Sequence, residues 1–130
     1  MAIGADDILE IHNVLAKYGH VVDDHDWERG NEVFADDFVF DRSAFGQADL
    51  HGLKDIVATF LGRNMFAHFT GNVTMEEQTD GTVRAHSKFI SFTNEGQPVT
   101  GDYDDILVRT DAGWRLQRRS ASVRQRKFFD

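Results

Sequence analysis

The sequence predicts one α+β domain, in which three helices come first and a curved antiparallel sheet comes last. Two observations support this prediction: apolar residues recur at helical spacing early in the chain, and they alternate with polar residues later. A chain of 130 residues with 41% hydrophobic residues suits a single core, and no repeat or proline-rich linker divides it. We therefore treat residues 1–130 as one domain, with helices covering one face of a twisted sheet.

The first half of the chain predicts three helices and one short strand. The first helix is expected from Asp7 to Asp24, where Asp7 and Glu10 have the spacing of a capping box. Asp26 is a favourable N-cap for a second, shorter helix. Residues 38–40 are expected to form a strand, and the third helix is expected from Leu53 to Leu61. The apolar stripe of the first helix is formed by Ile8, Ile11, Leu15, Tyr18 and Val22.

The second half predicts a four-strand antiparallel meander. Its hairpins are indicated by Asp80-Gly81 and by a short turn that contains Gly113. A sheet that curls around helices leaves a concave pocket, which is the usual place for a small ligand. The expected strands are Phe66–Glu76, Thr82–Thr93, Thr100–Thr110 and Trp114–Arg124.

Composition excludes several classes of function. The absence of cysteine excludes disulfide scaffolds, thiolate nucleophiles and zinc fingers, and no phosphate-binding loop motif is present. A formal net charge of -8 argues against a nucleic-acid partner, and no apolar run approaches the ~18 residues of a membrane span. The acidic N-terminus does not resemble a signal peptide, so we expect a cytoplasmic protein. We also expect that the protein uses no cofactor.

Two residues are candidates for acid–base chemistry. His68 is expected in the first long strand, and Asp23 is expected at the end of the first helix. An aspartate that holds an imidazole in one tautomer makes the ring a competent general base. Periodicity alone leaves the alternative open, in which His68 is an ordinary structural histidine and Asp23 is a helix-end acid.

Short motifs occur along the chain in a fixed order. These segments are Tyr18, Val22-Asp23, Asp26-Trp27, Phe34-Ala35-Asp36-Asp37, His68 with Asn72, Gly101-Asp102-Tyr103, Leu107-Val108-Arg109-Thr110, and Gly113-Trp114-Arg115-Leu116 with Arg118. Their order resembles that of the SnoaL-like branch of the nuclear transport factor 2 superfamily, and the resemblance covers nearly the whole chain. It implies a cone of curved sheet closed by helices.

The resemblance also implies a function. In the scytalone dehydratase and lindane dehydrochlorinase branch, an aspartate of the first helix pairs with a histidine of the first long strand, and here the matching residues are Asp23 and His68. The implied activity is that of a cofactor-independent lyase or isomerase, of dehydratase or cyclase type, acting on a small apolar cyclic or polyketide-like substrate. Val22 stands where scytalone dehydratase has a tyrosine, which argues against that particular enzyme. The ketosteroid isomerase pattern has no clear counterpart.

Four further residues are candidates for substrate binding. Tyr18 either donates its hydroxyl into the pocket or packs its ring in the core, and Tyr103 presents the same two alternatives. His86 is a candidate second histidine, although Thr82, Arg84, His86 and Lys88 on one face would make that face solvent-exposed. Arg118 and Arg119 point to opposite faces of the last strand, and we favour Arg118 as the one that enters the pocket.

A metal site and a non-catalytic function remain as alternatives. His20 and Asp24 have a spacing that ligates metals, but without further ligands we expect an exposed polar face and no metal. The second function is a ligand-binding or assembly module on the same fold, because proteins of this superfamily often dimerise through the open face of the sheet. We expect a homo-oligomer, a dimer or trimer. A plugged pocket, or Phe128 and Phe129 lying over its mouth, would favour the module.

Overall fold

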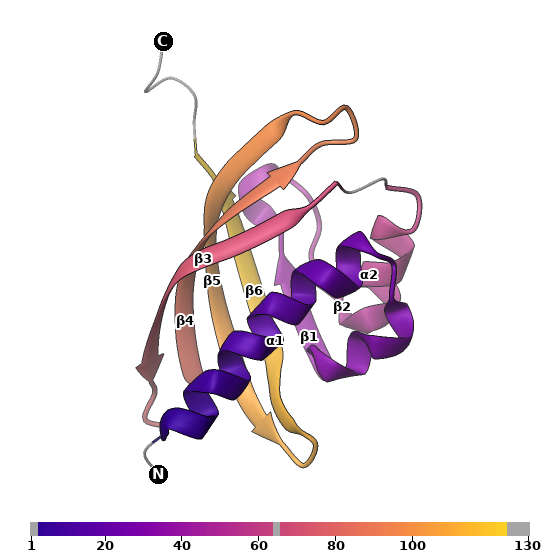
Figure 1. The fold of residues 1–130 in the computed structure, drawn as a ribbon. Coiled ribbons are helices and arrows are strands. Elements are labelled where there is room, and N and C mark those ends of the chain that lie inside the picture. Colours follow the sequence, from indigo (N-terminus) through magenta and orange to yellow (C-terminus); the bar gives the residue numbers. More distant parts are fainter. Residues whose placement is uncertain (1–2, 64–65, 125–130) are drawn as a thin grey trace.

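The structure is a computed structural model that describes residues 3–63 and 66–124. Helix α1 crosses the concave face of a curved six-stranded sheet, and helix α2 lies beside the first two strands (Figure 1). The elements are α1 (Ala5–Asp23), the 3-10 helix η1 (Trp27–Glu32), β1 (Phe34–Asp41), the 3-10 helix η2 (Ser43–Phe45), β2 (Leu50–His51), α2 (Gly52–Phe60), β3 (His68–Glu77), β4 (Val83–Phe92), β5 (Pro98–Thr110) and β6 (Gly113–Val123).

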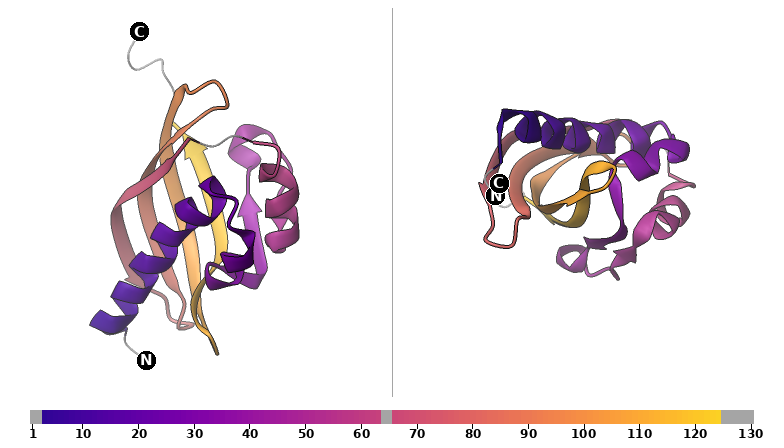
Figure 2. Two further views of the ribbon diagram at one scale, coloured as in Figure 1. Left: turned by 45° about the vertical axis from the view of Figure 1, so that its right-hand side comes forward. Right: turned by 90° about the horizontal axis from the view of Figure 1, so that it is seen from below.

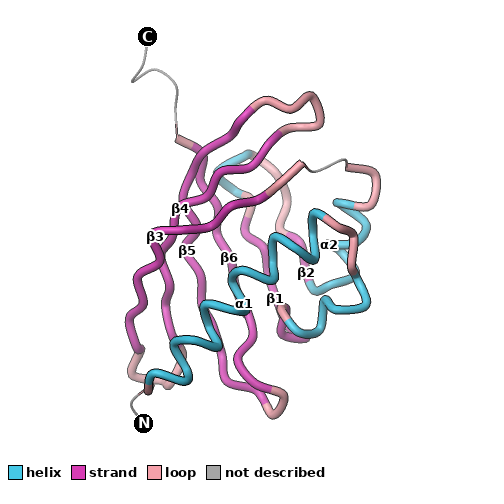
Figure 3. Tube along the Cα trace, viewed as in Figure 1, coloured by secondary structure: helices cyan, strands magenta, loops and turns pink. Residues whose placement is uncertain are grey.

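The strand order is β2-β1-β6-β5-β4-β3. The predicted four-strand meander, β3 to β6, is confirmed, because each of these strands pairs antiparallel with the next. Strand β1 adds to it in parallel beside β6, and β2 pairs antiparallel with β1. Seen from below, the sheet curls and α1 lies across its open side (Figure 2), and the helices gather on one side of the strands (Figure 3). The α+β fold class is confirmed.

Some local predictions are wrong. Helix α1 begins at Ala5, and the N–H of Gly4 donates to the Asp7 carboxylate at 2.9 Å, so Asp7 is not the N-cap. Glu10 instead accepts a hydrogen bond from the N–H of Trp114 at 2.6 Å, which ties α1 to β6. The second helix is the 3-10 helix η1, and Asp26 precedes it without a side-chain cap.

The core fills the space between α1 and the concave face of the sheet. Ile11 and Val22 of α1, Phe38 of β1 and Leu107 of β5 are fully buried, and Trp114 of β6 is 1% exposed. None of the described helices is long and apolar enough to cross a membrane. Some residues of this core, among them Phe40, Phe60 and Phe89, also line a cavity.

Two β-bulges change which side chains point into the cone. In β6, Leu116 pairs with Leu107 and Arg118 pairs with Ile106, so Gln117 is an extra residue. In β3, the three steps from Gly71 to Thr74 face only two steps of β4. Each bulge reverses the inward and outward faces of its strand on either side of the extra residue.

Candidate active site

Asp23 and His68 form a partly buried pair. The Nδ1 atom of His68 lies 2.5 Å from Oδ1 of Asp23, and the backbone N–H of His68 donates to Oδ2 of Asp23 at 2.7 Å. The side chain of Asp23 is only 15% exposed and that of His68 only 6% exposed. Because a carboxylate accepts, the ring hydrogen that this contact needs is on Nδ1, and in the neutral form of the ring the lone pair is then on Nε2. The predicted pairing of these two residues is present in the structure.

A glycine lets α1 approach the strand that carries His68. A Cβ atom at Gly19 would lie 3.1 Å from the carbonyl oxygen of His68 and 3.4 Å from its Cβ atom. Gly19 precedes Asp23 by four residues, so both are on the same face of α1. The close approach at Gly19 therefore brings the Asp23 carboxylate within hydrogen-bond reach of β3.

The β3 bulge turns His68 inward. Val73 and Met75 pack against the core, and simple alternation from them would direct Phe69 inward. The extra residue near Asn72, which has a φ of +53°, reverses that order, so Phe69 is 63% exposed and His68 is mostly buried. The location of the candidate base thus depends on an irregularity of the strand.

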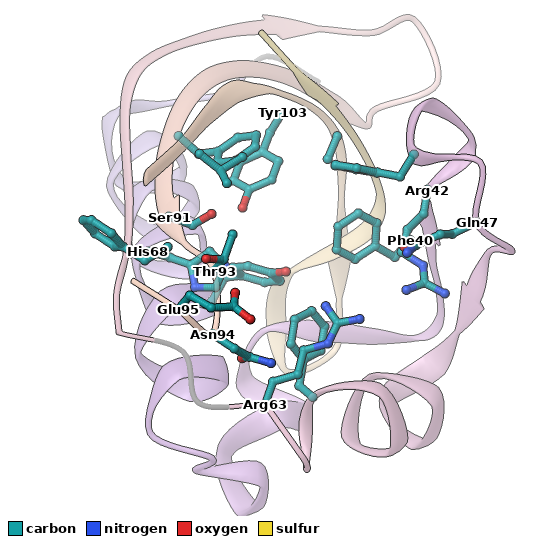
Figure 4. Close-up of a pocket in the computed structure, with 17 residues that line it drawn as sticks. Phe40, Arg42, Gln47, Arg63, His68, Ser91, Thr93, Asn94, Glu95 and Tyr103 are labelled. Carbon is teal, nitrogen blue, oxygen red and sulfur yellow. The ribbon is translucent and has the colours of Figure 1, made fainter. Parts of the chain in front are cut away.

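His68 lines a cavity of about 430 Å³ (Figure 4). Its apolar wall includes Phe40, Phe60 and Phe89, and polar side chains gather around its opening. This volume lies within the range of about 300–1,000 Å³ that is usual for small-molecule sites. The remaining lining residues are Tyr18, Arg42, Phe45, Gln47, Arg63, Ser91, Phe92, Thr93, Asn94, Glu95, Val99, Tyr103 and Ala121.

Tyr18 and Tyr103 lie in the deep part of this cavity. The ring of Tyr18 is edge-on to the rings of His68 and Tyr103, at centroid distances of 5.8 and 6.1 Å. Burial raises the pKa of both phenols, and the nearby Arg119 guanidinium opposes this rise. Both phenols therefore stay protonated at neutral pH and are able to donate a hydrogen bond to an oxygen in the cavity.

A fully buried ion pair supports the two tyrosines. Arg119 donates from Nε and Nη2 to the two carboxylate oxygens of Asp105, at 2.8 and 2.9 Å, and both side chains are 0% exposed. The guanidinium carbon lies 3.5 Å from the centre of the Tyr103 ring and 4.2 Å from that of Tyr18. The positive charge is thus held against the faces of both rings, where it is stabilised by cation–π interaction.

Two predicted substrate-binding residues lie on the outer face of the sheet, away from the cavity. His86 is half-exposed and contacts Asp102 at 3.1 Å, and Arg118 donates to Asp41 at 2.9 Å. The expectation that Arg118 enters the pocket is wrong, because the bulge at Gln117 turns Arg119 inward instead. His86 follows the strict alternation of β4, in which Ala85 and Ser87 are the inward residues.

Other polar groups of the cavity were not anticipated from the sequence. Ser91 pairs with His68 across β3 and β4, and Arg42, Arg63 and Glu95 come from segments without a strong sequence pattern. The alternation of β4 contains the signal for Ser91, since it follows the inward Phe89 by two residues. His20 and Asp24 have the spacing of metal ligands, but residues 3–63 and 66–124 contain no group of three or more His, Asp or Glu side chains placed to hold a metal ion.

The fold defines a class of small proteins described as cystatin-like and nuclear transport factor 2-like. Residues 4–120 match the family model of the SnoaL-like domain, and the chain belongs to this family. An uncharacterized protein of Mycobacterium tuberculosis, Rv2910c, is 32% identical over 126 residues, which cover 87% of this chain and 82% of that protein.

Solved structures share the fold over most of their length. A nuclear transport factor 2-like protein with a cystatin-like fold from Novosphingobium aromaticivorans is 27% identical, with a TM-score of 0.76, over 91% of this chain and 82% of that one. A protein of the same organism, provisionally named a scytalone dehydratase, is 17% identical, with a TM-score of 0.75, over 91% of this chain and 84% of that one. These likenesses show that the chain shares their fold.

Proposed function

We propose that this protein is a cofactor-independent lyase or isomerase that uses His68 as a general base on a small, mostly apolar cyclic or polyketide-like substrate. The observation that carries the proposal is the Asp23–His68 pair in the wall of an open cavity. Asp23 fixes the ring with hydrogen bonds to its side chain and its backbone. Such a constraint is the usual support for a histidine that takes protons.

The proposed reaction begins with a proton transfer. Nε2 of His68 removes a proton from a carbon next to a carbonyl group, and the electron pair of that C–H bond forms an enolate. The hydroxyl of Tyr18 or Tyr103 donates to the enolate oxygen, and Asp23 stabilises the imidazolium. The imidazolium then returns its proton either to a departing hydroxyl group, which leaves as water, or to another carbon. The first outcome is an elimination and the second is an isomerisation.

The form of the cavity favours the enzyme over the non-catalytic module. Phe40, Phe60 and Phe89 line the cavity without filling it. A module that only binds or assembles has no need for a carboxylate and an imidazole held together at 2.5 Å in a mostly buried site. The sequence leaves open whether Phe128 and Phe129 cover the mouth of the cavity or form a frayed tail, and both residues lie outside the described residues.

Hydrogen–deuterium exchange tests the base without requiring the natural substrate. 2-Tetralone, a two-ring ketone with an acidic C–H bond, is incubated in D₂O with the protein, and deuterium incorporation is followed by proton NMR. We expect the wild type to accelerate exchange above buffer, and His68→Ala to remove most of this acceleration. A positioned general base contributes about 10²–10⁴-fold. His86→Ala is the matched control, because this histidine lies on the outer face and should leave the exchange rate unchanged.

Two results would contradict the proposal. One is full exchange activity in His68→Ala with a circular dichroism spectrum like that of the wild type. The other is an equal loss in His68→Ala and His86→Ala, which would show that the effect does not come from the cavity.

A further inference from the structure

Two arginines line the mouth of the cavity without an acidic partner. Arg42 comes from the segment after β1, and Arg63 comes from the segment after α2. Across the described part of the chain neither is in an ion pair. Arg115 is not in one either, since its guanidinium group donates to backbone carbonyl oxygens. The other described arginines are all in ion pairs: Arg29, Arg84, Arg109, Arg118, Arg119 and Arg124. In a chain with 22 acidic and 14 basic residues, two unpaired guanidinium groups in one cavity are unexpected.

The structure holds both side chains at the cavity. Nε of Arg42 donates to the carbonyl oxygen of Ala48 at 3.0 Å, which fixes one edge of its guanidinium group. The guanidinium carbon of Arg63 lies 5.1 Å from the centre of the Phe60 ring, and Phe60 is part of the apolar wall. Both arginines are half-buried, so their charges are less screened than those of fully exposed side chains.

The charges at the mouth are separated. Glu95 is the one acidic residue among those that line the cavity in the described structure. Figure 4 places it on the His68 side of the opening, with the guanidinium groups of Arg42 and Arg63 on the other side. An anionic group would therefore be attracted to the arginine side and repelled from the His68 side. This would leave the apolar part of the same molecule in contact with the wall and with His68.

We propose that Arg42 and Arg63 form an anion site that determines substrate specificity, and that the substrate is a two- or three-ring compound that carries a carboxylate. This inference rests on the proposed function, since it assigns the substrate class of the same cavity. The planar guanidinium group suits a carboxylate because two parallel N–H groups match its two oxygens. The carboxylate remains at the mouth, and the ring system lies along Phe40 and Phe60, with its reacting carbon toward His68.

A matched pair of probes tests the anion site by binding alone. 2-Naphthoate and 2-naphthamide have nearly the same shape and differ in charge, and their dissociation constants are measured by isothermal titration calorimetry. We expect wild-type protein to bind the naphthoate about tenfold or more tightly than the amide, as for hydrogen bonds to a charged group. The double variant Arg42→Gln/Arg63→Gln should bring this ratio close to one. Arg118→Gln, an arginine of the outer face, should keep the wild-type ratio.

The outcomes separate this inference from the proposed base. Equal binding of the two probes by the wild type, no measurable binding of the naphthoate, or an unchanged ratio in the double variant would each overturn the anion site. A preference for naphthoate that depends on the arginines would stand even if His68→Ala retained full exchange activity, because that result would reject only the base. Conversely, His68-dependent exchange without any preference for naphthoate would reject only the anion site.

Discussion

Neutralising the buried carboxylate of Asp105 should destabilise the protein strongly. Asp105→Asn keeps the shape of the side chain, but it leaves the Arg119 guanidinium at 0% exposure without a counter-charge. It also replaces one of the two accepting carboxylate oxygens with an amide NH₂ group, which is a donor. Breaking one half of a buried ion pair costs about 3–5 kcal/mol. Since a domain is stable by about 5–15 kcal/mol, this loss is a large part of the total, and the melting temperature should fall by about 10–20 °C.

The neighbouring residue supplies a control with the same geometry. Asp104 accepts from Nε and Nη2 of Arg84, at 2.9 and 2.5 Å, but on the outer face, where these side chains are 40% and 56% exposed. Exposed pairs contribute about 0–1 kcal/mol, so Asp104→Asn should change little. The measurement is urea unfolding followed by tryptophan fluorescence. Equal free energies of unfolding for the two variants, within about 1 kcal/mol, would refute the argument that burial makes Asp105 important.

The other predictions concern the close approach of α1 and the acid limit of stability. Gly19→Val should push α1 away from the carbonyl oxygen of His68, at a cost of about 1–3 kcal/mol, and reduce exchange of 2-tetralone. Gly62→Val, which meets no atom within 4 Å, should do neither in thermal melts and exchange assays. Arg29 and then Lys17 lower the pKa of Glu32 from 4.5 to about 2. Because the folded pKa is the lower one, this contribution is complete above about pH 4.5 and is lost toward pH 2. The urea midpoint of unfolding is therefore measured as a function of pH for wild type and Glu32→Gln, and the decrease between about pH 4.5 and pH 2 should be smaller in the variant. An equal decrease in both proteins would show that Glu32 makes no such contribution.

Regular periodicity predicted most of the fold. The apolar stripe of α1 and the alternation of β3 to β6 are long signals, so errors at single positions did not matter. Strand β1 was recognised only as residues 38–40, because its placement beside β6 depends on a parallel contact between distant segments. The local propensity of a few residues contains no information on such a partner.

The pairing of Asp23 with His68 came from the resemblance to a family, and not from the pattern of the residues. In the sequence these residues are 45 positions apart, and the contact depends on the missing side chain of Gly19. A glycine inside a helical pattern gives only a weak indication of close packing. The arginines of the cavity mouth follow β1 and α2, where no periodic pattern directs side chains, so they were not recognised as candidates.

The chemistry inside the cone is decided where the strands are irregular. Regular pairing continued from Leu116 and Leu107 would bring Arg118 inward, opposite Asp105, whereas the bulge at Gln117 puts Arg119 in that position. Without the bulge near Asn72, Phe69 would replace His68 in the wall. The two bulges thus decide which arginine forms the ion pair beneath the tyrosines and which residue of β3 lines the cavity wall. A hydrophobic pattern averaged over a strand does not detect such an insertion, because it changes the phase of the alternation while leaving the apolar content the same.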